Sequence, residues 1–220
     1  MKSINHEAIE ASTVYMMQRG VYLLQAHRFA GSEMEHATRL LRWADPEPDA
    51  DIIDFGSGTG SLAAAWLDVR PDLKFTLVNV NKFQLDMSPE ACHTILCDME
   101  RVPTYGSSFD MVLACFSIGH ADAEAVIKEA SRLLRPGGVL FIYDMLPNPE
   151  KSEDLLALDY ELHTREDMER WATQAQFSAD FYLEPADRQT LQNVIPEVAS
   201  VFQDIKPVIY RFIRGANGNL

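Results

Sequence analysis

The sequence predicts an α/β fold: a mostly parallel β-sheet with helices on both faces. Short, continuously apolar runs alternate with stretches of helical periodicity, and a glycine-rich turn directly follows the first run. Strands that are apolar throughout are buried on both faces, as in a parallel sheet between two helical layers. A length of 220 residues, 47% hydrophobic and 24% charged, suits a single globular domain.

The N-terminal part of the chain, residues 1–44, is predicted to be helical. Apolar side chains such as Val14, Met17 and Val21 recur there at helical spacing. The polar, proline-rich stretch DPEPDA (45–50) follows as a loop. We therefore expect one domain over residues 1–220, in which residues 1–44 form an N-terminal helical cap.

The central part of the chain supplies most of the predicted sheet. The predicted strands are DIIDF (51–55), KFTLVNV (74–80), HTILCDM (93–99), FDMVLACFSI (109–118) and GVLFIYDML (138–146). Helices are predicted over 61–70 and 123–135, and RPGG ends the second of them. The segment between the second and third strands leaves room only for a brief helix.

The C-terminal part is polar and acidic after Pro147 and then returns to strand-like patterns. Thr164 with Asp167 predicts a capping box that opens a helix. The runs FSADFYLEP (177–185) and KPVIYRFIR (206–214) predict two further strands, which are expected to form an antiparallel edge on the parallel sheet.

Composition narrows the classes of partner and compartment. The formal net charge is −14, and such an acidic surface repels nucleic acid, so we expect no nucleic-acid partner. No apolar run is long enough to span a bilayer, and the N-terminus lacks a signal-peptide core. A cytoplasmic protein without a membrane span is the expectation, and a homodimer is left open.

The cysteines and histidines indicate no structural metal. Cys92, Cys97 and Cys115 are an odd set without a CxxC pair, which predicts reduced and at least partly buried thiols. Histidine and acidic residues form no cluster at metal-ligand spacing, so no metal is expected. A divalent ion bridging a substrate diphosphate is left open.

The glycine-rich turn is the first candidate binding element. Gly56, Gly58 and Gly60 follow the first strand directly and precede a helix, an arrangement that lets a ligand approach the backbone closely. A dinucleotide fingerprint would need its last glycine at the position of Ser61, and no GK[ST] follows for a P-loop. A plain strand-to-helix turn is the alternative interpretation.

Further motifs around the turn indicate a protein family. Asp54 precedes the turn, Asp98 ends the third strand in CDMERVP (97–103), FDMVLACFSIGH (109–120) contains the fourth, and RLLRPGGVLFIYD (132–144) closes the unit. From about Ala50 to Asp144 the chain resembles the class I S-adenosylmethionine-dependent methyltransferases. The resemblance implies a seven-stranded sheet with an antiparallel last strand and S-adenosylmethionine as the cofactor. An NAD-dependent oxidoreductase fits less well.

The resemblance also implies roles for individual residues. Asp54 and the glycine turn would cradle the methionine and ribose portions, Asp98 would accept from the adenine amino group, Met99 would lie against adenine, and Phe116 would lie near the methyl group. Alternatively, Asp98 caps a turn, and Met99 and Phe116 are core residues. The complete set of expected cofactor contacts is Asp54, Gly56, Ser57, Gly58, Gly60, Asn79, Asn81, Gln84, Asp98, Met99 and Phe116.

Asn79 departs from the family pattern, since most members carry an acid there that binds both ribose hydroxyls. An asparagine amide can accept one such hydrogen bond and donate another. The pattern Asn79-x-Asn81-x-x-Gln84 is similar to the sterol, terpenoid and cyclopropane-fatty-acid branch of the family. The alternative is neutral drift at a tolerant position.

Candidates for catalysis are His120, Tyr15 and Tyr22. His120 follows the fourth strand and could act as a base, or it could cap the helix that begins near Asp122. Tyr15 and Tyr22 lie on the N-terminal helices, either in a lid over the cofactor or in ordinary packing. FSIGH (116–120) lacks the acid that terpenoid C-methyltransferases often carry nearby.

The predicted function is S-adenosylmethionine-dependent methylation of a small molecule, with C-methylation of an isoprenoid or lipid-like acceptor as the leading interpretation. The alternatives are an O- or N-methyltransferase that uses His120, or a non-catalytic protein of the same fold that holds cofactor or a partner protein without turnover.

Overall fold

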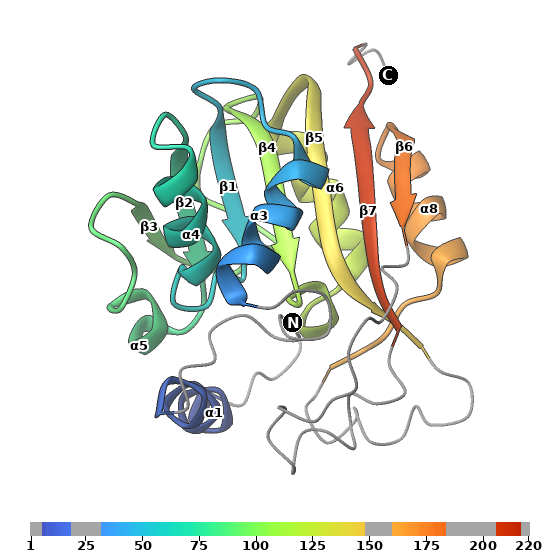
Figure 1. Ribbon diagram of the computed structural model, residues 1–220. Helices are drawn as coiled ribbons and strands as arrows, with labels where there is room; N and C mark the ends of the chain where they lie inside the picture. Colours follow the sequence, from blue (N-terminus) through green and yellow to red (C-terminus); the bar gives the residue numbers. More distant parts are fainter. Residues whose placement is uncertain (1–5, 19–31, 148–159, 184–205, 217–220) are drawn as a thin grey trace.

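A seven-stranded sheet forms the centre of the protein. The computed structural model describes residues 6–18, 32–147, 160–183 and 206–216, and its strand order is β3-β2-β1-β4-β5-β7-β6 (Figure 1). The strands are β1 (Asp51–Phe55), β2 (Lys74–Asn79), β3 (His93–Leu96), β4 (Phe109–Cys115), β5 (Leu134–Leu146), β6 (Phe177–Leu183) and β7 (Lys206–Arg214). The neighbours among β1–β5 pair in parallel, whereas β7 is antiparallel to both β5 and β6. The predicted sheet is confirmed, including its antiparallel edge.

Helices cover both faces of this sheet. The helices are α1 (His6–Gln18), α3 (Glu33–Ala44), α4 (Ser61–Val69), α5 (Lys82–Leu85), the 3₁₀ turn η1 (Ile118–His120), α6 (Ala123–Leu133) and α8 (Arg165–Gln174). Figure 1 shows α3 and α4 on the near face and α6 and α8 behind the sheet, with α1 and α5 beside the edge where the parallel strands end. The brief helix expected between β2 and β3 is α5.

Successive side chains of β1 point to opposite faces of the sheet, so they belong to two separate parts of the core. Ile53 and Phe55 are fully buried in the cluster that includes α6 and α8, whereas Ile52 is buried with the residues of α3 and α4. On the second face the Trp66 indole packs between these helices and donates from Nε1 to the Ala37 carbonyl at 3.0 Å. Both faces are apolar, which explains why β1 lacks a polar/apolar alternation.

Several strand ends differ from the predicted ranges, among them β2, which ends at Asn79 and not at Val80. The strand β5 begins at Leu134, inside the range expected to be helical, and Leu134 pairs with Phe109 before the register shifts. The Gly137 backbone has a φ of 81°, a left-handed conformation that a glycine adopts without steric cost. The predicted third and fourth strands also extended too far, since β3 ends at Leu96 and β4 at Cys115.

Side-chain caps define the helix starts. Asp122 accepts from the Ala125 amide and caps α6. The Thr164 hydroxyl accepts from the Asp167 amide at 3.1 Å, so the predicted start of α8 is confirmed. Cys92, Cys97 and Cys115 are free and partly buried thiols, as expected. In the part of the chain that the structure describes, no helix is long and apolar enough to cross a bilayer.

Candidate functional site

The crevice lies where the strand order changes direction. β1 has β2 on one side and β4 on the other, so the connections from β1 and β4 leave towards opposite edges of the sheet. In open parallel sheets the space beyond the carboxyl ends at such a point is where ligands bind. The glycine turn after β1 borders this space, and the amides of Gly56 and Ser57 both donate to the Val78 carbonyl, at 2.9 and 3.0 Å.

Each glycine of the turn has a φ between 57° and 75°, but the three have different surroundings. A Cβ on Gly56 would lie 2.5 Å from the Ser117 Cβ, and one on Gly60 would lie 2.7 Å from Leu77 Cδ1. A Cβ on Gly58 would meet nothing within 4 Å. The Gly58 backbone therefore borders open space, as a ligand-binding turn requires.

Polar groups without partners surround the turn. Within the described residues, the hydroxyl oxygens of Ser57 and Ser117 are buried and have no hydrogen-bond partner. Such groups are costly in a protein interior unless a ligand or water satisfies them. They fit S-adenosylmethionine, whose amino, carboxyl and ribose groups can supply the missing partners.

Asp54 adds a carboxyl group to this side of the crevice. Its side chain is on the same face of the sheet as Ile52, is 3% exposed, and its pKa is raised to about 7 because burial disfavours the charged form. No hydrogen bond from another described residue offsets this burial. A buried acid without a partner suits a cationic ligand, and S-adenosylmethionine carries a sulfonium and an ammonium.

Asn79 is engaged by the protein itself. Its Nδ2 donates to the Gly58 carbonyl at 3.3 Å and to Gln84 Oε1 at 2.8 Å, and its Oδ1 accepts from the Asn81 amide at 3.0 Å. Both donors are used, so a ribose hydroxyl could be bound only through the second lone pair of Oδ1. The structure brings the predicted residues Asn79, Asn81 and Gln84 together beside Gly58.

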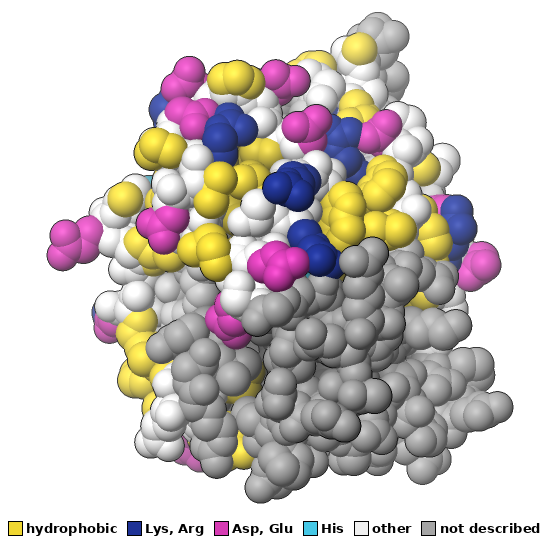
Figure 2. Space-filling view, viewed as in Figure 1, with side chains coloured by type: hydrophobic (Ala, Val, Ile, Leu, Met, Phe, Trp, Pro, Cys, Tyr) yellow, Lys and Arg dark blue, Asp and Glu magenta, His cyan; other side chains and the backbone are white. Residues whose placement is uncertain are grey.

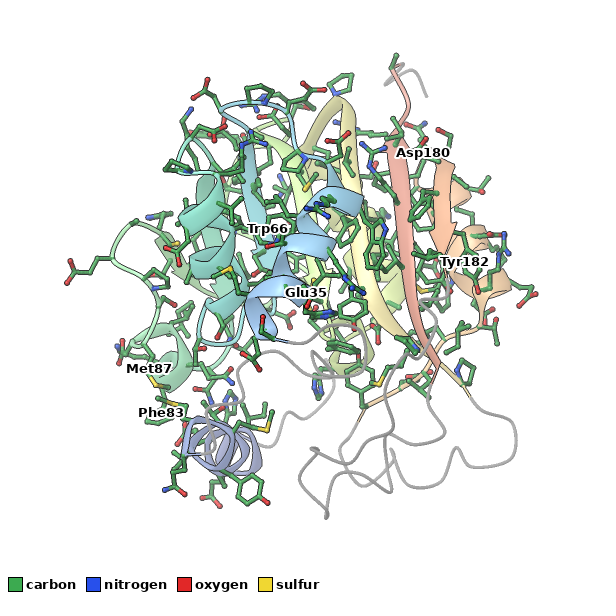
Figure 3. All side chains as sticks on the ribbon, in the orientation of Figure 1. Glu35, Trp66, Phe83, Met87, Asp180 and Tyr182 are labelled. Atoms are coloured by element: carbon green, nitrogen blue, oxygen red, sulfur yellow. The ribbon has the colours of Figure 1, made fainter. Side chains whose placement is uncertain are left out.

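The helix α1 is hydrogen-bonded to the same residues. Gln84 Nε2 donates to the Thr13 hydroxyl at 2.8 Å, and Asn81 Nδ2 donates to Glu10 Oε1 at 3.3 Å. Figure 3 shows Phe83 and Met87 at the junction of α5 and α1. Sequence reasoning did not find Thr13 and Glu10, because nothing in α1 signals a contact with residues 71 positions further along the chain.

The loop after β3 carries Asp98 and Met99. Asp98 Oδ1 accepts from the Glu100 amide at 2.9 Å, so one carboxylate oxygen closes a turn. This hydrogen bond is the turn cap that was the alternative role for Asp98. The second carboxylate oxygen, Oδ2, takes no part in it. Met99 is 9% exposed and packs in the core on the α6 side.

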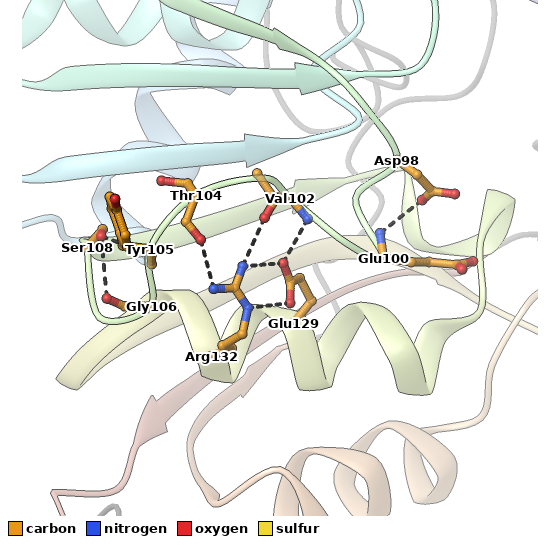
Figure 4. A network of polar contacts seen from close by, with 9 residues as sticks. All are labelled: Asp98, Glu100, Val102, Thr104, Tyr105, Gly106, Ser108, Glu129 and Arg132. Carbon is orange, nitrogen blue, oxygen red and sulfur yellow. Dashed lines mark hydrogen bonds and ion pairs between the residues drawn. The ribbon is translucent and has the colours of Figure 1, made fainter.

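An ion pair on α6 holds the rest of that loop. Arg132 donates to Glu129 and to the carbonyls of Val102 and Thr104, and Glu129 accepts from the Val102 amide at 2.8 Å (Figure 4). The pKa of Arg132 is raised, first because of its hydrogen bond to Glu129. These contacts fix the loop that presents Asp98.

The end of β4 has a strained backbone. Phe116 has a φ of 50°, which is uncommon for a bulky residue, and its amide donates to the Tyr143 carbonyl at 2.8 Å. The Phe116 and Tyr143 rings meet edge to face with centroids 4.5 Å apart. The expected cofactor neighbour Phe116 therefore lies at the carboxyl end of the sheet, against an aromatic residue of β5.

His120 lies in a polar and aromatic cluster at the crevice rim. Its ring meets the Tyr160 ring edge to face at 4.7 Å, and the Tyr160 hydroxyl donates to Asp144 Oδ1 at 2.6 Å. Burial raises the pKa of Asp144 to about 7, against the effect of this hydrogen bond. Asp122, not His120, caps α6. Sequence reasoning missed Tyr160, because contacts between segments far apart in the chain bring it to the rim, among them the bond from the Glu161 amide to the Gly119 carbonyl at 2.9 Å.

The other expected residues are placed as follows. Tyr15 is a partly buried residue of α1, whereas Tyr22 lies outside the described residues. A pocket of about 430 Å³ lies beside the turn, bordered by Met17 of α1, Met34 of α3 and Thr59 and Gly60 of the turn. In the described ranges no three His, Cys, Asp or Glu side chains gather as metal ligands.

This sheet order and crevice define the class of S-adenosylmethionine-dependent methyltransferases. A sequence profile of the family described as "Hypothetical methyltransferase" matches residues 3–161, and the chain belongs to this family. The shared region includes both the glycine turn and the residues that carry the expected cofactor contacts.

Among the proteins similar to this chain are two curated relatives and one solved structure. Ribosomal RNA-processing protein 8 of Caenorhabditis briggsae is 34% identical over 104 residues, which cover 47% of this chain and 28% of that protein. Sterol 4-C-methyltransferase strm-1 of Caenorhabditis elegans is 25% identical over 167 residues, with coverage of 64% and 50%. The chain thus spans half or less of the length of these relatives.

The solved structure is geranyl diphosphate C-methyltransferase from Streptomyces coelicolor A3(2), in complex with Mg²⁺, geranyl diphosphate and S-adenosyl-L-homocysteine. It aligns with a TM-score of 0.73 at 15% identity, over 83% of this chain and 79% of that one. At this identity the similarity shows a common fold.

Proposed function

We propose that this protein transfers a methyl group from S-adenosylmethionine to a carbon atom of a small isoprenoid or lipid-like acceptor. The observation that carries the proposal is the hydrogen-bonded pair of Asp144 and Tyr160 beside His120. Methylation of an alkene carbon leaves a cation that must lose a proton, so the site needs a base. FSIGH lacks an acid, and Asp144 supplies one from the next strand.

Each part of the site would have its own task. The bound cofactor supplies an electrophilic methyl group on sulfur. Asp54 and the turn at Gly56–Gly60 would hold the cofactor, with Asp98 and Met99 on the adenine side, and Phe116 would lie near the methyl group. The Phe116 ring, which meets Tyr143 edge to face, would stabilise positive charge on the acceptor. The substrate proton would pass to the Tyr160 oxygen as the phenol proton moves to Asp144.

The relatives support an apolar acceptor over RNA. Sterol 4-C-methyltransferase and geranyl diphosphate C-methyltransferase are named for acceptors of isoprenoid origin. The ribosomal RNA-processing relative raises RNA as a rival, but a net charge of −14 opposes phosphate binding. On the face drawn in Figure 2, basic side chains stand among acidic and apolar ones over the described surface.

The test is methyl transfer from methyl-labelled S-adenosylmethionine to geranyl diphosphate with Mg²⁺, to a sterol, and to total RNA. We expect label in the extracted sterol or, after phosphatase treatment, in the extracted prenyl alcohol, and none in RNA. Label in RNA alone would refute the acceptor class. Absence of binding to both S-adenosylmethionine and S-adenosylhomocysteine in calorimetry would refute the enzyme itself.

A heteroatom acceptor is the second candidate, because His120 is only partly buried and lies at the same rim. An O- or N-methyltransferase would use its imidazole as the base. His120→Gln would then abolish transfer, whereas Tyr160→Phe would abolish it for a carbon acceptor. Residues 1–220 would form one domain in either case, with residues 1–44 as its N-terminal helical cap.

A further inference from the structure

The side chains of Asn79, Asn81 and Gln84 are here called the amide chain. A backbone donor determines which atom of these side-chain amides is the oxygen and which is the nitrogen. The Asn81 amide can only donate, so the atom of Asn79 that faces it is the oxygen, at 3.0 Å. The Asn79 nitrogen must then face the Gly58 carbonyl, at 3.3 Å, and Gln84 Oε1, at 2.8 Å. The orientation of both side chains follows from this one backbone donor.

The same order of donors and acceptors continues into α1. Since Gln84 Oε1 faces Asn79, Gln84 Nε2 faces the Thr13 hydroxyl, which accepts at 2.8 Å. The Thr13 hydroxyl gives its own proton to the Ile9 carbonyl, also at 2.8 Å. A continuous hydrogen-bonded path therefore runs from the Gly58 carbonyl to the backbone of α1.

A second path joins the same elements. Asn81 Oδ1 accepts from the Gln84 amide at 3.0 Å and caps α5, which leaves Asn81 Nδ2 to donate to the Glu10 carboxylate at 3.3 Å. Asn81 is 1% exposed and Asn79 is 7% exposed, so neither amide can exchange its partner freely with water. Bonds to a carboxylate are stronger than neutral ones, which favours this geometry.

This path explains why residue 79 is an asparagine. A carboxylate at this position could still accept from the Asn81 amide, but it would place oxygen against the Gly58 carbonyl. Gln84 could turn its amide over to compensate, whereas the Gly58 carbonyl belongs to the backbone and cannot. An amide at position 79 thus suits the contact between the glycine turn and α1 better than a carboxylate would.

The far end of α1 also reaches the turn. Met17 borders the pocket of about 430 Å³ together with Thr59 and Gly60. The helix therefore approaches the turn at two places: through hydrogen bonds near Thr13 and across this pocket near Met17.

We infer that Thr13 and Glu10 are positioning residues for the cofactor: through the amide chain they hold the Gly58 turn in its binding geometry, so docking of α1 and cofactor affinity are coupled. The inference rests on the cofactor assignment and not on any acceptor. Coupling is reciprocal, so cofactor must stabilise the docked helix by the same factor by which the helix strengthens cofactor binding.

The experiment is calorimetry with S-adenosylhomocysteine on the full chain. Thr13→Val removes the hydroxyl at nearly constant shape and is expected to lower affinity about five- to tenfold, the effect of one lost hydrogen bond. Thr13→Ser keeps the hydroxyl and should restore affinity. The matched control is Thr38→Val, since Thr38 makes the same bond to its own helix, to the Met34 carbonyl at 2.8 Å.

Hydrogen exchange supplies the readout that a purely structural role would not change. In the wild type, S-adenosylhomocysteine should increase protection of amides in residues 6–18, and in Thr13→Val this increase should disappear. Equal affinities of wild type and Thr13→Val would overturn the inference while leaving the cofactor assignment standing. No binding by the wild type would overturn the cofactor assignment and the inference with it.

Discussion

The Tyr160 hydroxyl donates a 2.6 Å hydrogen bond to the Asp144 carboxylate, and both side chains are more than nine-tenths buried. Asp144 lies near the carboxyl end of β5, whereas Tyr160 reaches it from a later segment whose Glu161 amide is hydrogen-bonded to the Gly119 carbonyl. A Cβ on Gly119 would lie 2.3 Å from the Tyr160 ring, so the glycine allows the ring to approach. The pair places an ionisable acid next to His120, at the rim where we propose that the acceptor binds.

The pH dependence of the free energy of unfolding should reflect the protonation of Asp144. Its pKa is raised from 3.8 to about 7, so the folded state binds more protons than the unfolded state between these values. The free energy of unfolding therefore falls as the pH rises from about 4 to 7. Asp144→Asn should make this decline shallower while keeping an acceptor for Tyr160. Urea titrations at pH 5 and pH 8 measure the difference.

The control for this prediction is Glu124→Gln, an exposed acid of α6. Cys115, Tyr160 and Tyr210 are the other titratable groups that interact with Asp144, and burial is the first cause that raises the pKa of each. They titrate above the tested range, so they should not mask the effect. Identical pH slopes for wild type and Asp144→Asn would contradict the prediction.

Cofactor binding should be linked to the ionisation of Asp54. Burial raises the pKa of its carboxyl to about 7 in the free protein, and a bound cation would favour the charged form. Affinity for S-adenosylmethionine should therefore increase as the pH rises from 6 to 8, with proton release. Calorimetry in buffers of different ionisation enthalpy counts the protons. Asp54→Asn should bind weakly and release none; an unchanged proton count would sink this assignment.

Two glycine substitutions should separate binding from folding. Gly58→Ala adds a methyl group to open space. It should therefore reduce the free energy of unfolding only by the cost of its positive φ, roughly 1 kcal/mol, and lower the thermal midpoint slightly. Its methyl group should nevertheless obstruct the cofactor and weaken binding at least about tenfold. Gly60→Ala would meet Leu77 and Pro89 and should mainly destabilise the fold. The opposite ranking in melting and calorimetry would show that Gly58 does not face the cofactor.

Arg132 should stabilise the loop that carries Asp98. Arg132→Met removes its bonds to two backbone carbonyls and leaves the buried Glu129 without a cation, which should cost about 2–4 kcal/mol. Adding Glu129→Gln should recover part of the loss, because no buried charge remains. Arg39→Ala is the control, because that pair with Glu35 lies on an exposed helix face and is worth about 0–1 kcal/mol. Chemical denaturation of the four proteins provides the comparison.

Local patterns were sufficient for most of the fold. Largely apolar runs such as DIIDF identify strands because burial on both faces removes the polar/apolar alternation, and the buried Asp54 is the exception, beside the glycine turn. The Thr164 cap was predictable because its bond to Asp167 spans three residues. The start of β5 was not, because Leu134 is a strand residue only through its pairing with Phe109, on another strand.

For the site, the sequence by itself determined the family, the glycine turn and the position of the unusual asparagine, because these depend on residue types at short spacing. The tertiary structure alone decided what Asn79 contacts, that α1 reaches it through Thr13 and Glu10, and that Asp144 meets Tyr160. These contacts join residues 5 to 71 positions apart, and side-chain hydrogen bonds over the longer separations leave no periodic trace in the chain. Only folding brings their donors and acceptors within 3.5 Å of each other.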